Sequence, residues 1–196
     1  ESTVNRHHGG LIFNSRDVTE RVRLQAQLQH NAEHDPLTDL PNRALFTRRV
    51  QQALSGRRAS DRGAALRGTA VLFIDLDGFK GVNDRHGHAI GDKVLKQASA
   101  RLWGTTRETD MLARLGADEF ALLLRPIERP SDAASIAERI VRAMAAPFNV
   151  DGHQIVIGAS VGIAMSPADG DSADTLMKSA DMALRRAKDE GRAAYH

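Results

Sequence analysis

Apolar residues recur along this 196-residue chain in two patterns, one typical of strands and the other of helices. Short apolar runs, several of them flanked by turn-forming residues, predict the strands. They are Thr69–Ile74, a β-hairpin from Met111 to Leu124, and a second hairpin that turns at Asp151-Gly152 and carries Ile155–Ile157 and Ser160–Ala164.

Longer stretches predict four helices. The first begins within Asp39–Leu45 and ends near Leu54, and the others span Asp92–Trp103, Ser131–Ala145 and Ala173–Glu190. Ser131 is expected to cap its helix and Gly191 to end the last one. Ser55–Gly68 is rich in glycine and arginine without periodicity, which predicts an exposed loop. The order of elements predicts an α+β fold, with a central, mostly antiparallel sheet flanked by helices.

An extended helix is predicted at the N-terminal end, over residues 17–33. Asp17 can cap this helix, and Glu20 completes a capping box. The apolar positions allow two interpretations, a short two-stranded coiled coil or an ordinary helix lying on its own domain. These positions are Val18, Val22, Leu24, Leu28 and Ala32.

Composition narrows the function classes. There is no cysteine, which excludes disulfides, thiolate metal ligands and cysteine nucleophiles, and which fits a cytoplasmic location. No apolar run approaches the roughly 20 residues of a membrane span. The chain begins with Glu1, so we expect a fragment of a longer protein that could be membrane-tethered upstream. A net charge of +2 with one Trp and one Tyr argues against nucleic-acid binding.

Closely spaced carboxylates follow or precede two of the predicted strands. The segment F-I-D-L-D-G-F-K-G-V-N-D (Phe73–Asp84) places Asp75 and Asp77 on one face of an extended chain. The segment R-L-G-A-D-E-F (Arg114–Phe120) places Asp118 and Glu119 just before another strand. If the two strands are neighbours, these carboxylates converge, as sites that hold hard cations and phosphates require.

The residues that follow suit a nucleotide. Gly78 and Gly81 allow backbone N–H groups to approach a phosphate chain, and Lys80 adds a cation there. Asn83 and Asp92 together can recognise the donor and acceptor edge of guanine. Taken alone, Asn83 would be a turn residue and Asp92 a helix cap.

These motifs resemble the GGDEF family, the diguanylate cyclases. The segment D-P-L-T-D-L-P-N-R (Asp35–Arg43) matches the opening signature of the family, and Ala180–Arg192 matches its closing helix. The resemblance covers about His34 to Arg192 and makes residues 34–196 the GGDEF domain. It implies a palm-like nucleotidyl-cyclase fold and a homodimer that condenses two GTP into cyclic di-GMP with two Mg²⁺ or Mn²⁺ ions per site. Residues 1–16 resemble the remnant of a PAS-type sensor, with residues 17–33 as its signalling helix.

The resemblance also implies a role for individual residues. The metal ligands would be Asp75, the backbone carbonyl of Leu76, Asp118 and Glu119, and Glu119 and Lys80 would also be catalytic. The substrate phosphates would be held by Gly78, Phe79, Lys80, Gly116, Lys188 and Arg192. The guanine base would be bound by Asn83 and Asp92. Lys188 and Arg192 are expected to be i,i+4 neighbours on the last helix. Arg107 and Asp110 match the inhibitory product site, with Arg139 or Arg142 as a second arginine.

The sequence departs from the family pattern at four positions. Ala117 replaces the second glycine of the signature, Gly78 a common aromatic, Arg185 a frequent tyrosine and Ala193 a frequent asparagine. A type II′ turn with Gly116 at positive φ would accommodate Ala117. The rival hypothesis is a non-catalytic receptor for GTP or cyclic di-GMP. A related enzyme that accepts ATP would require a different residue at Asp92.

Overall fold

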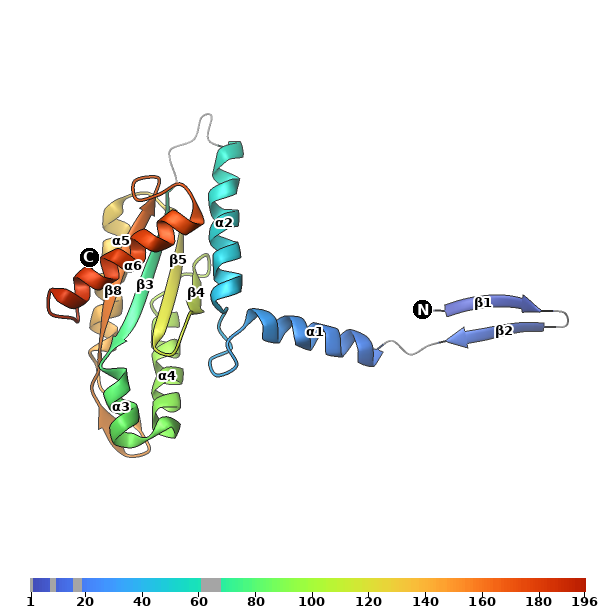
Figure 1. The fold of residues 1–196 in the computed structure, drawn as a ribbon, viewed down its shortest axis with the longest axis horizontal. Helices are drawn as coiled ribbons and strands as arrows, with labels where there is room; N and C mark the ends of the chain where they lie inside the picture. Colours follow the sequence, from blue (N-terminus) through green and yellow to red (C-terminus); the bar gives the residue numbers. More distant parts are fainter. Residues whose placement is uncertain (1, 8–9, 16–18, 61–67) are drawn as a thin grey trace.

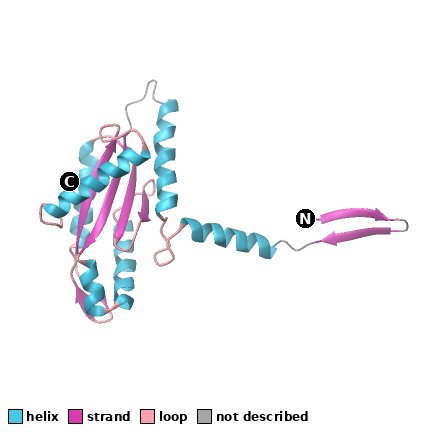
Figure 2. Ribbon diagram, in the orientation of Figure 1, coloured by secondary structure: helices cyan, strands magenta, loops and turns pink. Residues whose placement is uncertain are grey.

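The computed structural model describes residues 2–7, 10–15, 19–60 and 68–196. Its centre is a four-stranded antiparallel sheet in the order β4-β5-β3-β8. The strands are β3 (Gly68–Asp77), β4 (Met111–Arg114), β5 (Glu119–Ile127) and β8 (Gly158–Ser166). Helices lie on both faces of this sheet (Figures 1 and 2), so the predicted α+β architecture is confirmed.

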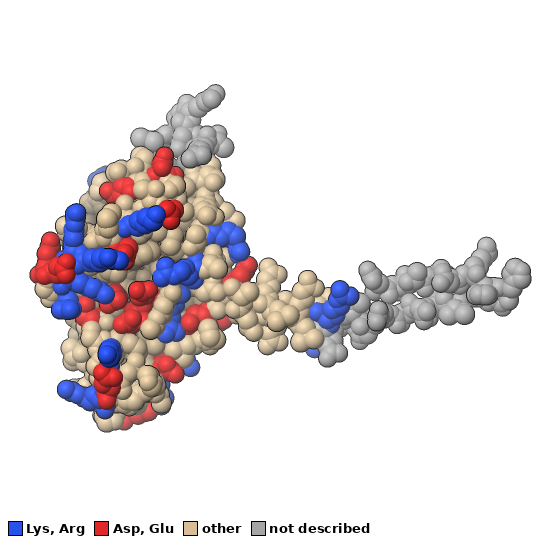
Figure 3. Space-filling view, in the orientation of Figure 1, with Lys and Arg blue, Asp and Glu red and all other residues tan. Residues whose placement is uncertain are grey.

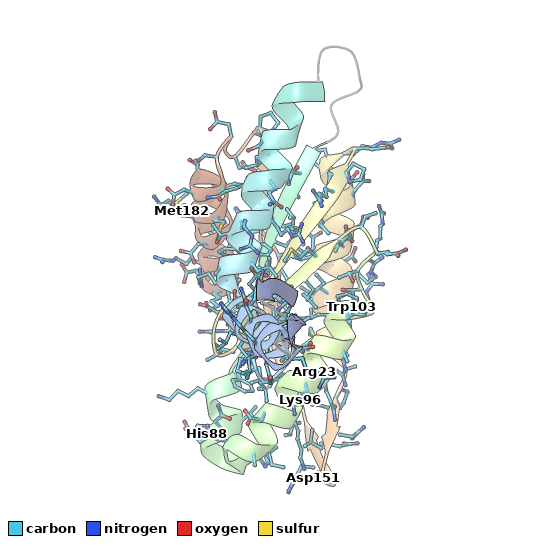
Figure 4. All side chains as sticks on the ribbon, turned by 90° about the vertical axis from the view of Figure 1, so that its right-hand side faces the viewer. Arg23, His88, Lys96, Trp103, Asp151 and Met182 are labelled. Carbon is cyan, nitrogen blue, oxygen red and sulfur yellow. The ribbon has the colours of Figure 1, made fainter. Side chains whose placement is uncertain are left out.

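Alternation along β3 divides the core into two layers. Leu72 and Ile74 point into a cluster with α4 (His88–Trp103) and α5 (Pro130–Met144). Val71 and Phe73 point into a second cluster with α2 (Arg43–Ser60) and α6 (Ala173–Asp189). Because side chains alternate along a strand, Asp75 and Asp77 continue the row that faces α2 and α6. Figure 4 shows α2 beside α6, with Met182 pointing outward from α6.

Three helices differ from the sequence prediction. α2 continues to Ser60, because arginine and alanine favour a helix and outweigh the single Gly56. A short helix, α3 (Phe79–His86), was not predicted. α4 begins at His88 after Gly87, so the prediction of a helix starting at Asp92 was wrong.

The start of one further helix and the strands of the second predicted hairpin also need correction. α5 begins at Pro130, a residue well suited to the first helical position, so Ser131 is not its cap. The Asp151-Gly152 turn joins β6 (Phe148–Val150) to β7 (His153–Ile155) in a separate small hairpin. Both turn residues have positive φ, as a type I′ turn requires. The strand predicted at Ser160–Ala164 belongs instead to β8 of the main sheet.

The N-terminal region contains an antiparallel pair, β1 (Ser2–His7) and β2 (Gly10–Ser15), followed by α1 (Thr19–Glu33). Asp17, the predicted cap, lies outside the described residues. α1 projects from the domain in Figure 1 and exposes Leu24 and Leu28. Within the described residues, no helix is long and apolar enough to cross a membrane.

Candidate functional site

The predicted metal-binding carboxylates lie at one end of β3 and β5. Asp75 is paired with Glu119 across the two strands, which places both side chains on the α2/α6 face. The backbone N–H of Leu76 donates to the carbonyl oxygen of Asp118 at 3.2 Å. The end of β3 and the turn before β5 are therefore joined, and the two strands are neighbours, which is the condition under which the sequence analysis expected the acidic motifs to converge.

Two basic side chains accompany these acids. Lys188 on α6 lies 2.8 Å from Asp75, and Arg43 at the start of α2 lies 3.2 Å from Glu119. Burial raises the pKa of Asp75, against the effect of Lys188 and with a further contribution from the charge of Asp118. Negative charge on the buried Asp75, close to that of Asp118, favours a cationic partner at this point.

The oxygen atoms at this end of the sheet are of the kind that binds a hard divalent cation, but they are not already arranged as a metal-binding site. Carboxylates and a backbone carbonyl are the oxygen ligands that Mg²⁺ and Mn²⁺ take. Among the described residues, no three acidic or histidine side chains are close enough together to hold a metal ion. Asp75 and Glu119 would have to exchange Lys188 and Arg43 for the ion.

The start of α3 lies next to this acidic end. Gly78 has a φ of 76°, a left-handed conformation that glycine adopts freely, and it precedes the first turn of the helix. N–H groups in a first helical turn lack intrahelical partners and suit phosphate. Phe79 is buried in the core and anchors this turn, whereas Lys80 is exposed.

Arg192 is not on the last helix. α6 ends at Asp189, and the N–H of Arg192 donates to the carbonyl of Ala187 at 3.2 Å, as in a Schellman motif with Gly191 at its centre. The predicted i,i+4 relation of Lys188 and Arg192 is therefore wrong, because Gly191 turns the chain before Arg192. Arg192 stands in a left-handed turn beyond the helix, with a φ of 65°.

The predicted guanine-reading residues come from two adjacent helices. Asn83 is on α3, and Asp92 is an exposed residue inside α4. Gly91 lies directly beneath the Asn83 side chain: a Cβ added there would be 1.9 Å from Asn83 Oδ1. The small residue before Asp92 thus allows Asn83 to come close to it.

If Asn83 binds guanine as the sequence predicts, Gly91→Ala is expected to displace the Asn83 side chain and lower the affinity for a guanine nucleotide by about tenfold to a hundredfold, the scale of lost polar contacts to a ligand. Stability should change little, because the atom displaced is the end of a flexible side chain and alanine suits a helix. Calorimetric titration with a non-hydrolysable GTP analogue measures the effect. In an Asn83→Ala background the added methyl group should cost no further affinity; a full additional loss there would contradict this explanation.

The turn between β4 and β5 spans Leu115 to Asp118 and is longer than the predicted two-residue turn. Gly116 does not have positive φ, so the type II′ prediction was wrong; the four-residue loop closes without it. Ala117 also has negative φ and is accommodated without strain. The carbonyl of Ala117 accepts a hydrogen bond from Arg114 at 2.6 Å.

Arg114 connects this turn to the segment that follows α1. Its guanidinium also donates to Asp35 at 2.8 Å, and Asp35 accepts from the Thr38 side chain at 2.7 Å. Burial alone would raise the pKa of Asp35, but the hydrogen bonds from Thr38 and Arg114 hold it below its usual value. Sequence reasoning gave Arg43 and Arg114 no role, although both lie within the quoted motifs; only the tertiary structure identifies their partners.

Arg107 and Asp110 form a compact turn after α4. The Asp110 carboxylate accepts from the backbone N–H of Arg107 at 2.9 Å, which leaves the Arg107 guanidinium for other partners. Arg139 on α5 donates to the carbonyl of Thr105, two residues before Arg107, whereas Arg142 pairs with Glu138 at 2.6 Å. Of the two candidates for a second arginine, Arg139 is the one held beside this turn.

A cleft of about 490 Å³ opens between α2 and α6 on the same face as the carboxylates. Arg43 and Glu119 line it together with Phe73 and Asp181. Basic and acidic side chains are interspersed over the face that carries α6 (Figure 3). The cleft therefore leaves open space next to Glu119.

Comparison with known proteins assigns the chain to a class. Residues 32–194 match the family model described as "Diguanylate cyclase, GGDEF domain". The chain is 47% identical over 176 residues to diguanylate cyclase TpbB of Pseudomonas aeruginosa, covering 88% of this chain and 39% of that protein. It is 44% identical over 178 residues to the bifunctional diguanylate cyclase/cyclic di-GMP phosphodiesterase MucR of the same species, covering 91% of this chain and 25% of that protein.

Solved structures agree. The GGDEF domain of TpbB superposes with a TM-score of 0.77 at 44% identity, over 82% of this chain and 91% of that one. The coiled coil and GGDEF domain of DgcB from Caulobacter crescentus, in complex with c-di-GMP, gives a TM-score of 0.78 at 26% identity, over 90% and 92% of the two chains. The chain therefore belongs to the GGDEF family of diguanylate cyclases, and it spans well under half the length of the two curated relatives.

Proposed function

We propose that this chain condenses two molecules of GTP into cyclic di-GMP and releases two pyrophosphates. One observation carries the proposal: a single end of the sheet brings together Asp75, Glu119 and Lys188, directly beside the helix start at Gly78. Acidic groups for cations, basic groups for phosphates and a pair of polar side chains for the base are the components that such a phosphoryl transfer needs.

Each residue group has a distinct task in the proposed reaction. Asn83 and Asp92 orient guanine, while the first turn of α3, Lys80 and Lys188 hold the triphosphate. Arg192 and the backbone at Gly116 complete the substrate contacts. Asp75, the Leu76 carbonyl, Asp118 and Glu119 would bind two divalent cations. When bound, Mg²⁺ or Mn²⁺ lowers the pKa of the attacking hydroxyl and offsets charge on the leaving group.

The bond changes are the same in both half-reactions. The 3′-oxygen of one GTP forms a bond to the α-phosphorus of the other, and the bond from that phosphorus to the bridging oxygen breaks. Pyrophosphate leaves with the electron pair, and the 3′-hydroxyl proton passes to Glu119. Lys80 balances the charge that develops on the phosphates.

One chain holds one GTP, so the reaction requires two subunits whose sites face each other. The cleft beside Glu119 supports this arrangement, because it leaves the α2/α6 face open to a second substrate. We further propose that residues 17–33 act as a signalling helix that pairs the subunits and that residues 1–16 end an upstream sensor. The Asp35–Arg114–Ala117 connection supports regulation through this helix, since it joins the segment that follows α1 to the turn before Glu119.

The test uses the purified chain with a leucine zipper fused before α1 to enforce dimerisation. We expect cyclic di-GMP and pyrophosphate in a 1:2 ratio from GTP and Mg²⁺, detected by chromatography, and no cyclic product from ATP. Ala117→Gly should raise the rate modestly. If the parent dimer produces no cyclic di-GMP but the glycine variant does, the chain is a receptor and the proposal fails.

We also propose that cyclic di-GMP inhibits the enzyme at Arg107 and Asp110, with Arg139 as the second arginine. Arg107→Ala should relieve product inhibition at least about tenfold while leaving the initial rate unchanged, because a charged contact to phosphate or base is lost away from the carboxylates. Inhibition constants measured with added cyclic di-GMP test this, with Arg142→Ala as the matched control. Unchanged inhibition in the Arg107 variant would contradict the assignment.

A further inference from the structure

Asp77 is the second carboxylate of the Asp75–Asp77 pair, and both of its hydrogen bonds are to residues other than the predicted metal ligands. Its Oδ1 accepts a hydrogen bond from Ser160 Oγ at 2.8 Å, and its Oδ2 accepts one from the backbone N–H of Ala193 at 3.0 Å. Ser160 is fully buried on β8, whereas Ala193 lies in the turn that follows α6. Asp77 therefore joins a central strand of the sheet to the chain beyond the last helix.

The turn that Asp77 contacts is conformationally costly. Arg192 and Ala193 have φ values of 65° and 48°, a left-handed backbone conformation that is unfavourable for a residue with a Cβ. A left-handed backbone conformation of this kind persists only where contacts with the surrounding structure hold it in place. The Asp77 hydrogen bond acts on the second of these two residues, immediately after Arg192.

The chain on either side of this turn is also held. On one side, the Arg192 N–H closes the end of α6 on Ala187. On the other, residues 194–196 pair with the outer edge of β8: Val161 N–H donates to the Ala194 carbonyl at 2.9 Å, and Ile163 N–H donates to that of His196 at 2.8 Å. Between these two attachment points the chain is held by Asp77, which belongs to β3, the strand that also carries Asp75.

Gly158 leaves space for this contact. It is paired with Asp77 across β3 and β8, and a Cβ added there would lie 3.1 Å from Asp77 Oδ2 and 3.3 Å from the Ala193 Cβ. The carboxylate and the turn thus occupy the volume that a side chain at position 158 would fill.

We infer that Asp77 is a positioning residue for Arg192, which it holds in the left-handed turn where its guanidinium can reach the substrate phosphates together with Lys188. The inference rests on the proposed binding of GTP. The two carboxylates, at adjacent same-face positions of β3, then position two basic residues at and just beyond the end of α6 in different ways. Asp75 contacts the Lys188 side chain at 2.8 Å, and Asp77 accepts a hydrogen bond from the backbone next to Arg192.

The test is a double-mutant cycle on GTP binding and turnover. Asp77→Ala should raise the KM for GTP about tenfold, the scale of losing one charge-assisted phosphate contact, with a smaller change in kcat. In an Arg192→Ala background, Asp77→Ala should cause no further increase, because the side chain that it positions is absent. An equal increase in both backgrounds would overturn the inference.

Two further variants separate positioning from charge. Asp77→Asn retains both contacts, since its amide oxygen can accept from Ala193 and its NH₂ can donate to Ser160, so it should keep nearly the parent KM. Asp189→Ala makes the same charge change in the last turn of α6, away from Asp77, and should also resemble the parent. If Asp77→Asn instead behaves like Asp77→Ala, the charge rather than the contact matters and the inference is wrong.

A readout without substrate distinguishes this inference from the proposed function. Hydrogen exchange of the Ala193 amide should accelerate at least about tenfold in Asp77→Ala and not in Asp77→Asn. If the parent binds GTP but makes no cyclic di-GMP, the cyclase proposal fails, and the same cycle measured by calorimetric binding still decides the role of Asp77. If Ala193 exchange does not respond to Asp77→Ala, the inference fails whatever the enzyme does.

Discussion

Gly162→Ala is expected to destabilise the domain by about 3 kcal/mol or more, at the upper end of what overpacking costs. A Cβ added at Gly162 would lie 2.1 Å from the backbone nitrogen of Leu184 and 2.3 Å from the carbonyl oxygen of Ala180, both on α6. These are backbone atoms inside a helix, so no side chain can turn away to relieve the clash. The whole helix would have to move off β8. Urea unfolding monitored by circular dichroism measures the loss.

The matched control is Gly81→Ala. A Cβ added at Gly81 meets nothing within 4 Å, and alanine in a helix is favoured over glycine by roughly 0.5–1 kcal/mol. We expect this variant to be as stable as the parent or slightly more so. The Gly162 variant should also bind GTP more weakly, because α6 carries Lys188. Equal unfolding midpoints for the two variants would show that α6 does not rest on β8 as closely as the structure has it.

Much of the fold was predictable because its signals are local. The apolar runs within β3 and β5 were long enough to identify two strands, whereas their pairing with each other was only a condition of the prediction. α3 was missed because it has eight residues and only two buried apolar positions, Phe79 and Val82, which is too short for helical periodicity to register. Its start depends on the left-handed Gly78, a backbone property that sequence spacing does not reveal.

The candidate site was predictable in its residue types but not in its pairings. Asp75 and Glu119 could be assigned to the ends of two strands from the sequence, but the structure was needed to show that these strands are neighbours. The contacts of Asp77 with Ala193, of Arg43 with Glu119 and of Arg114 with Ala117 depend on how distant segments pack. Helical spacing could not place Arg192 in the turn beyond α6. Gly191 was recognised as the end of the helix, but the sequence does not show which direction the chain takes after that glycine.

Asp75→Asn is expected to reduce turnover at least about a hundredfold while preserving the fold. Loss of even an outer-shell partner of a metal ligand lowers metal affinity or activity by about 10–100-fold, and Asp75 is proposed as a direct ligand. An amide is a weak ligand for a hard cation, and Asp75 lies at the point where the β3 end, Glu119 and Lys188 meet. Asp189→Asn makes the same charge change at an exposed position of α6 and should retain parent activity. Product formation near the parent rate in the Asp75 variant would show that Asp75 does not serve the metal.

Metal-induced stabilisation supplies the pH test of the same residue. Burial raises the pKa of Asp75, so the folded state binds this proton more tightly than the unfolded state does. The metal-free fold is therefore favoured at pH values below the usual carboxyl pKa, and that contribution is lost as pH rises through the raised value. Mn²⁺ requires the ionised carboxylate, so the rise in melting temperature on adding Mn²⁺ should grow over the same interval and fade on acidification. In Asp75→Asn the metal-free protein should lose this pH dependence, and Mn²⁺ should leave its melting temperature unchanged; a shift as large as that of the parent would place the ion elsewhere.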